Sequence, residues 1–154
     1  MSRSLAAAVL VAPLALWSCS SKPRVGDPSV PRTTSPTTTT SNAVTVDQEF
    51  ELGPGQSALL GTEPLKVMFE TVTADSRCPP EVQCAWEGDA VAKVAVSLGR
   101  QAPTSYELHT NNGFPTQVNH GGYKIRLMGV APGPHNGVTI EPGSYVVTLV
   151  ITQS

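Results

Sequence analysis

The sequence is poor in charged and aromatic side chains. Charged residues make up 14% of the 154 residues and aromatic residues 5%, whereas soluble domains usually contain about 25% charged residues. The formal net charge is −2, and the part of the chain after position 42 holds six Lys and Arg against eleven Asp and Glu. Because nucleic-acid binding requires a basic face, this acidic balance argues against a nucleic-acid partner.

Sequence motifs of enzymes are also missing. The chain has no GxSxG, HExxH, SxxK or GxxxxGK[ST] pattern. Its three histidines, His109, His120 and His135, lie in or beside different predicted loops, and we expect them to be solvated loop residues rather than metal ligands. The sequence therefore predicts a protein that is not an enzyme and has no metal or cofactor. The alternative is a metal-handling or enzymatic domain whose site is assembled from distant loops.

The N-terminus has the features of an export signal. Arg3 precedes an apolar run from Leu5 to Trp17, which is shorter than the roughly 20 residues of a spanning helix and is typical of a signal peptide. The next residues complete the segment Leu16-Trp17-Ser18-Cys19. This segment resembles the lipobox of bacterial lipoproteins, although Trp17 stands where that family usually has a small or β-branched residue.

The lipobox resemblance implies a cleaved signal peptide over residues 1–18 and a lipid anchor on Cys19. In that family the thiol receives a diacylglyceryl group, and several acyl chains hold a protein firmly where one does not. The resemblance thus places the protein on the extracytoplasmic face of the cell membrane. The competing interpretation is a plain secretory signal followed by an incidental cysteine.

Residues 19–42 are predicted to be a disordered tether that begins with the lipidated cysteine. After Cys19 this segment contains four prolines, a threonine tract and only two apolar residues, Val25 and Val30. So little apolar surface cannot offset the entropy lost on ordering. We therefore expect a spacer between the membrane and a folded domain over residues 43–154.

The remaining sequence alternates between apolar and polar residues with a period of two, which is typical of half-buried strands. Gly, Pro and Asn separate the alternating segments. The expected strands cover residues 44–52, 57–60, 65–70, 90–98, 106–110, 123–127 and 145–151. About seven short strands predict an all-β fold, an antiparallel β-sandwich of immunoglobulin-like architecture. A small β-barrel is the alternative.

One motif, over residues 75–89, stands apart from the alternating pattern. It reads DSRCPPEVQCAWEGD and resembles a D-S-R-C-P-x₄-C-x-W-x-G signature of small exported bacterial proteins, mostly uncharacterised lipoproteins. The resemblance implies an architecture and no particular chemistry.

The two cysteines of this motif predict a disulfide. Cys78 and Cys84 are the only cysteines other than Cys19, and an even pair in an exported domain forms a bridge. Metal binding and thiol redox catalysis are disfavoured, because both normally use a CxxC spacing. Two further expectations concern neighbours of the bridge: Trp86 buries its ring beside it, and Arg77 pairs with Asp75 or Asp89.

A braced loop between two strands serves either as a structural staple or as a recognition surface. In the second interpretation it displays Arg77, Glu81, Trp86 and Glu87. Such a surface suits an envelope protein or a glycan. The leading functional hypothesis is thus a membrane-anchored, non-enzymatic binding or structural module.

Overall fold

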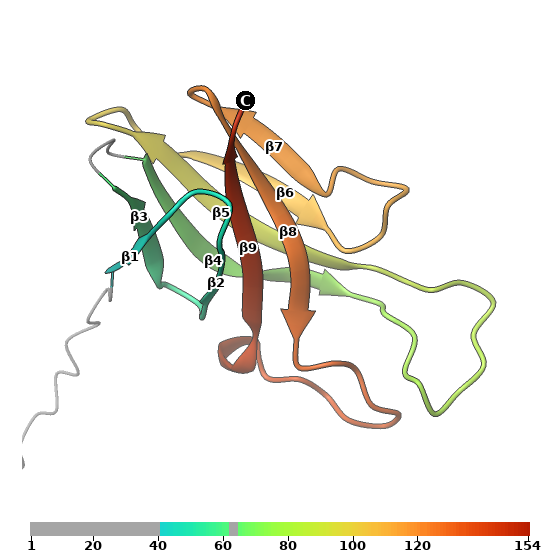
Figure 1. The fold of residues 1–154 in the computed structure, drawn as a ribbon. Coiled ribbons are helices and arrows are strands. Elements are labelled where there is room, and N and C mark those ends of the chain that lie inside the picture. Colours follow the sequence, from blue (N-terminus) through green and yellow to red (C-terminus); the bar gives the residue numbers. More distant parts are fainter. Residues whose placement is uncertain (1–40, 62–64) are drawn as a thin grey trace, which may run out of the picture. The chain divides into compact units, whose positions relative to one another are not determined.

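A computed structural model describes residues 41–61 and 65–154, and these residues form a β-sandwich of two sheets (Figure 1). The strands in chain order are β1 (Ser41–Val44), β2 (Glu49–Leu52), β3 (Ser57–Leu60), β4 (Leu65–Asp75), β5 (Ala90–Leu98), β6 (Thr104–His109), β7 (Gln117–His120), β8 (Tyr123–Ala131) and β9 (Val146–Gln153), with a 3₁₀ turn, η1 (Pro142–Ser144), before β9. One sheet has the order β1-β3-β4-β5-β6 and the other β2-β9-β8-β7. The predicted all-β sandwich is confirmed, and no closed barrel forms in this part of the chain.

The core lies between the two sheets and is built from alternate residues of each strand. In β9, Val147, Leu149 and Ile151 are fully buried, and the residues between them are half-buried. This strand lies between β2 and β8 in its sheet. Phe69 of β4 is the largest fully buried side chain opposite this sheet.

The strand predicted over residues 44–52 is wrong in one respect, because two strands from different sheets occupy it. β1 pairs in parallel with β3, and β2 pairs with β9. Between them Asp47 adopts a φ of 61° and donates its backbone N–H to the carbonyl of Ile151 at 2.8 Å. Aspartate tolerates this left-handed conformation better than most residues. The turn preserves the apolar parity on both sides, so the alternation gave no sign of it.

The start of the domain and the number of strands also differ from the sequence prediction. β1 begins at Ser41, two residues before the expected start of the domain at position 43. β7 is an additional strand that pairs with β8 through a tight turn at Gly121 and Gly122. The predicted signal peptide, the predicted lipidation site Cys19 and the remainder of the predicted tether lie outside the described residues.

β4 extends well beyond its predicted end and carries the chain to the site described below. Its burial alternates regularly as far as Phe69 and irregularly after it. Two bulges interrupt its pairing with β5, between Phe69 and Thr71 and between Val72 and Ala74. Bulges increase strand twist and redirect side chains. None of the described residues forms a helix long and apolar enough to cross a membrane.

Candidate recognition surface at one end of the sandwich

Three connections are held together by hydrogen bonds at one end of the sandwich, and we call this the loop end (Figure 1). They are residues 76–89 between β4 and β5, residues 110–116 between β6 and β7, and residues 132–141 between β8 and η1. The first of them, together with Asp75, is the motif over residues 75–89 that stands apart in the sequence. Its contacts with the other two determine what it presents to solvent.

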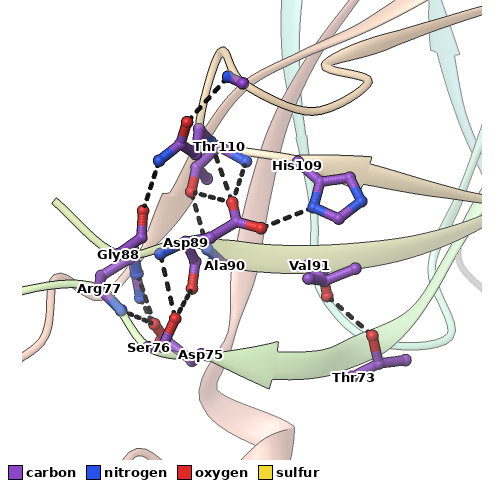
Figure 2. Close-up of polar contacts among 12 residues, drawn as sticks. Thr73, Asp75, Ser76, Arg77, Gly88, Asp89, Ala90, Val91, His109 and Thr110 are labelled. Carbon is purple, nitrogen blue, oxygen red and sulfur yellow. Dashed lines mark hydrogen bonds and ion pairs between the residues drawn. The ribbon is translucent and has the colours of Figure 1, made fainter. Parts of the chain in front are cut away.

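Asp89 joins the first two connections, as Figure 2 shows. Its Oδ1 accepts hydrogen bonds from the backbone N–H groups of Thr110 and Asn111, both at 3.0 Å, and from the Thr110 hydroxyl at 3.1 Å. Its Oδ2 lies 2.6 Å from Nδ1 of His109. The side chain of Asn111 returns a bond to the Gly88 carbonyl at 3.1 Å.

The environment of Asp89 keeps its carboxyl group ionised. Burial alone raises its pKa, but the hydrogen bonds from His109, Asn111 and Thr110 outweigh that effect and hold the pKa below its usual value of 3.8. A carboxylate with this many donors fixes the backbone of both connections. Sequence reasoning assigned no such role to Asp89, because its partners lie about 20 positions away.

Arg77 joins the first connection to the third. Its Nε and Nη2 donate to the two carboxylate oxygens of Asp75 at 2.9 and 2.6 Å. Its guanidinium also donates to the carbonyl of Val130, and to that of Pro132 at 2.8 Å. Only 14% of the Arg77 side chain is exposed. The prediction of a pair with Asp75 is therefore right, whereas the interpretation of Arg77 as a displayed recognition residue is wrong.

Tyr145, the residue between η1 and β9, completes this network. Its hydroxyl donates to Oδ2 of Asp75 at 3.1 Å, so it bonds to a side chain and not to the backbone as in a tyrosine corner. Burial raises the Asp75 pKa, yet the bonds and charge of Arg77, together with Tyr145, hold it below its usual value of 3.8. Burial, with the nearby Asp75 carboxylate, raises the pKa of Tyr145. At neutral pH Asp75 is therefore ionised and Tyr145 keeps its proton.

The motif loop is further constrained along its own backbone. The Sγ atoms of Cys78 and Cys84 lie at disulfide distance, 2.12 Å. The N–H of Cys78 donates to the carbonyl of Glu87 at 2.9 Å, and the N–H of Ser76 donates to that of Asp89 at 2.7 Å. Gly88 has a φ of 73°, and a Cβ there would lie 1.9 Å from the Ser76 carbonyl oxygen. Only glycine fits this position.

This constrained loop displays Trp86 to solvent. Its side chain is 83% exposed, so the expectation that it buries its ring beside the disulfide is wrong. Glu87 is exposed next to it. Glu81 lies on the other arm of the loop, where its carboxylate is 2.7 Å from Nδ1 of His135. That hydrogen bond is the main cause that lowers the pKa of Glu81. Of the four predicted recognition residues, three are therefore exposed and one is internal.

All three histidines were expected to lie in solvated loops, and two of them do not. His109 ends β6 and His120 ends β7, and both are half-buried. Nδ1 of His120 lies 3.0 Å from the Tyr106 hydroxyl, and only His135 is on an exposed loop. Each histidine has a different partner, and the described residues contain no group of three or more His, Cys, Asp or Glu able to hold a metal ion.

Phe114 is an exposed residue of the loop end that sequence reasoning missed. It lies in the second connection, its side chain is 55% exposed, and its ring stacks on that of His109 with centroids 5.0 Å apart. Val138 in the third connection is 63% exposed. Each connection therefore presents an apolar side chain from a fixed backbone.

Comparisons with family models, curated proteins and solved structures found no match to this chain.

Proposed function

We propose that this protein is an extracytoplasmic lipoprotein, anchored through Cys19, whose β-sandwich is a non-enzymatic binding module that recognises an envelope protein or glycan with its loop end. The observation that carries the proposal is Trp86. Its side chain is 83% exposed, and tryptophan is enriched among the few residues that dominate the binding energy of interfaces.

The rigidity of the loop end supports the same proposal. The disulfide, the Asp89 hydrogen bonds and the Arg77 contacts fix the backbone on which Trp86 stands. A prearranged surface loses less conformational entropy on binding than a flexible one. A loop that served only as a staple would gain more from a buried tryptophan, since burial of a large side chain contributes roughly 1.5–3 kcal/mol.

The proposed extracytoplasmic location is supported by the N-terminal sequence and by the disulfide. Leu16, Ser18 and Cys19 match the lipobox pattern, and a disulfide persists in oxidising compartments outside the cytoplasm. Intact-mass analysis of the membrane-extracted protein tests this part. We expect a mature chain that starts at Cys19 and carries the mass of a diacylglyceryl group. A lipid-free mature species released into the medium would contradict it.

The binding role is tested by comparing two exposed apolar residues on the full-length protein. Trp86→Ala removes the proposed anchor, and Met128→Ala is the matched control, because Met128 is 45% exposed and belongs to β8, outside the three connections of the loop end. Immobilised wild-type and Met128→Ala proteins should retain the same component of solubilised envelope, and Trp86→Ala should lose it. Equal retention by all three proteins would contradict a role for the loop end.

A further inference from the structure

A groove of about 400 Å³ lies beside the loop end, between the last residues of β4 and the segment that leads into β9. One wall is formed by four consecutive residues of β4, Val72–Asp75, and the opposite wall by residues 138–140. Successive side chains of a strand point to opposite faces of its sheet. A groove lined by four in succession therefore follows the backbone edge of β4 and does not lie on one face.

This backbone edge of β4 has no partner strand in the described part of the chain. β3 pairs with β4 only from Leu65 to Met68, and the next residue, Phe69, exchanges backbone hydrogen bonds with Gly55 and Gln56. From position 70 to position 75, β4 pairs with β5 alone. An unpaired edge is a template for another extended chain.

The sequence of this edge is suited to pairing. Residues 70–75 read ETVTAD, with three β-branched residues and without the lysine or proline that commonly protects an exposed edge. The extra residues of the two bulges, Glu70 and Thr73, belong to this segment of β4, and they increase its local twist. The side of β4 that faces away from β5 has no partner strand here among the described residues.

The groove is also preformed and electrically balanced. Tyr145 bonds to Asp75 across one end of it, and Arg77 binds Asp75 and the carbonyl of Pro132. These contacts hold the two walls at a fixed separation. Among the described residues, Asp75 and Arg77 are the only charged ones that line the groove, and they neutralise each other. An occupant without charge complements such a lining.

We propose that this groove binds an uncharged, extended polypeptide segment, which adds as a new strand to the free edge of β4. Main-chain hydrogen bonds supply affinity in this mode of recognition, and alternate side chains supply specificity. Apolar residues such as Val72 and Ile140 line the groove and are available to alternate side chains of the segment. The groove is separate from Trp86, so this proposal does not depend on whether Trp86 serves as an anchor.

The test uses seven-residue peptides selected from a random library on the full-length protein. Arginine is introduced on each wall of the groove, as Ala74→Arg and Thr139→Arg, both at exposed positions. Thr104→Arg is the matched control, because Thr104 is an exposed strand residue outside the groove lining. We expect the two groove variants to weaken peptide binding at least tenfold, and Thr104→Arg and Trp86→Ala to leave it unchanged.

Backbone N-methylation of a selected peptide then distinguishes strand addition from side-chain binding. Methylation removes one N–H donor at a time, and in a strand only every second N–H faces the neighbouring strand. Affinity should fall with a period of two along the peptide. Binding that is indifferent to N-methylation, or equal for the groove variants and Thr104→Arg, would overturn the proposal. Loss of binding only in Trp86→Ala would assign the peptides to the loop end and also overturn it.

Discussion

Replacement of Arg77 tests whether this residue braces the loop end or is displayed for recognition. Arg77→Ala removes the bidentate pair with Asp75 and the hydrogen bonds to the carbonyls of Val130 and Pro132. It leaves a carboxylate that is only 12% exposed without its cation. A merely displayed arginine would cost almost nothing when removed.

The size of the expected stability loss follows from the burial of the Arg77–Asp75 pair. An exposed ion pair is worth up to about 1 kcal/mol, whereas removal of one partner from a fully buried pair costs roughly 3–5 kcal/mol. Arg77 and Asp75 are mostly buried, with side chains 14% and 12% exposed. The two carbonyl bonds come from a charged donor and add to the loss. We expect Arg77→Ala to lower the free energy of unfolding by about 3 kcal/mol.

Urea unfolding of the full chain, followed by far-UV circular dichroism, measures this loss. Arg100→Ala is the control, because Arg100 is exposed in the turn after β5, and surface substitutions usually change stability by less than about 0.5 kcal/mol. Arg77→Lys keeps the charge without the planar fork and should lie between the two. Equal stability of Arg77→Ala and Arg100→Ala would refute the bracing role.

The stability difference between wild type and Arg77→Ala should also depend on pH, in a direction set by the Asp75 pKa. Arg77 helps to hold the Asp75 pKa below 3.8. A carboxylate with a depressed pKa stabilises the fold above its unfolded-state pKa, and this contribution is lost as the pH falls through the folded-state value. The stability difference between wild type and Arg77→Ala should therefore be full at neutral pH and shrink below pH 3.8. A difference that stays constant on acidification would contradict the ion-pair explanation.

The remaining predictions concern the loop backbone and the domain boundary. Cys78→Ala/Cys84→Ala should lower the free energy of unfolding by roughly 2 kcal/mol without unfolding the domain, since the bridge closes a short loop; urea titration checks this. Gly88→Ala should lower the melting temperature sharply, because its Cβ would lie 1.9 Å from a backbone oxygen, whereas Gly133→Ala meets nothing within 4 Å and should not. A chain that starts at position 43 should be about 1 kcal/mol less stable in urea titration than one that starts at position 37, because it lacks the backbone pairing of Ser41 and Asn42 in β1; equal stabilities would show that this pairing is dispensable.

The strands were predictable wherever one face is buried and the other is solvated. The expected strand over residues 90–98 has the bounds of β5, because its apolar alternation reports burial directly. The break between β1 and β2 was not predictable in this way. It depends on a single left-handed residue, Asp47, and on pairing with strands distant in sequence.

The site was predictable in its disulfide and in the Arg77–Asp75 pair, both of which join residues close in sequence. Composition and spacing sufficed for the Cys78–Cys84 pair, because a disulfide needs two cysteines in an oxidising compartment. Whether Arg77 and Trp86 are buried or exposed depends on the path of the loop. That path brings Arg77 to the carbonyls of Val130 and Pro132. It leaves Trp86 in solvent. Alternation encodes burial in strands and carries no such information for loops.

The central claim, that the loop end is a recognition surface, is tested most directly in living cells. A photo-crosslinking amino acid is placed at position 86 in one strain and at position 128, on the exposed face of β8, in another. We predict a discrete cross-linked product on illumination for position 86 and none for position 128. No product at position 86, or the same product at both positions, would contradict the account.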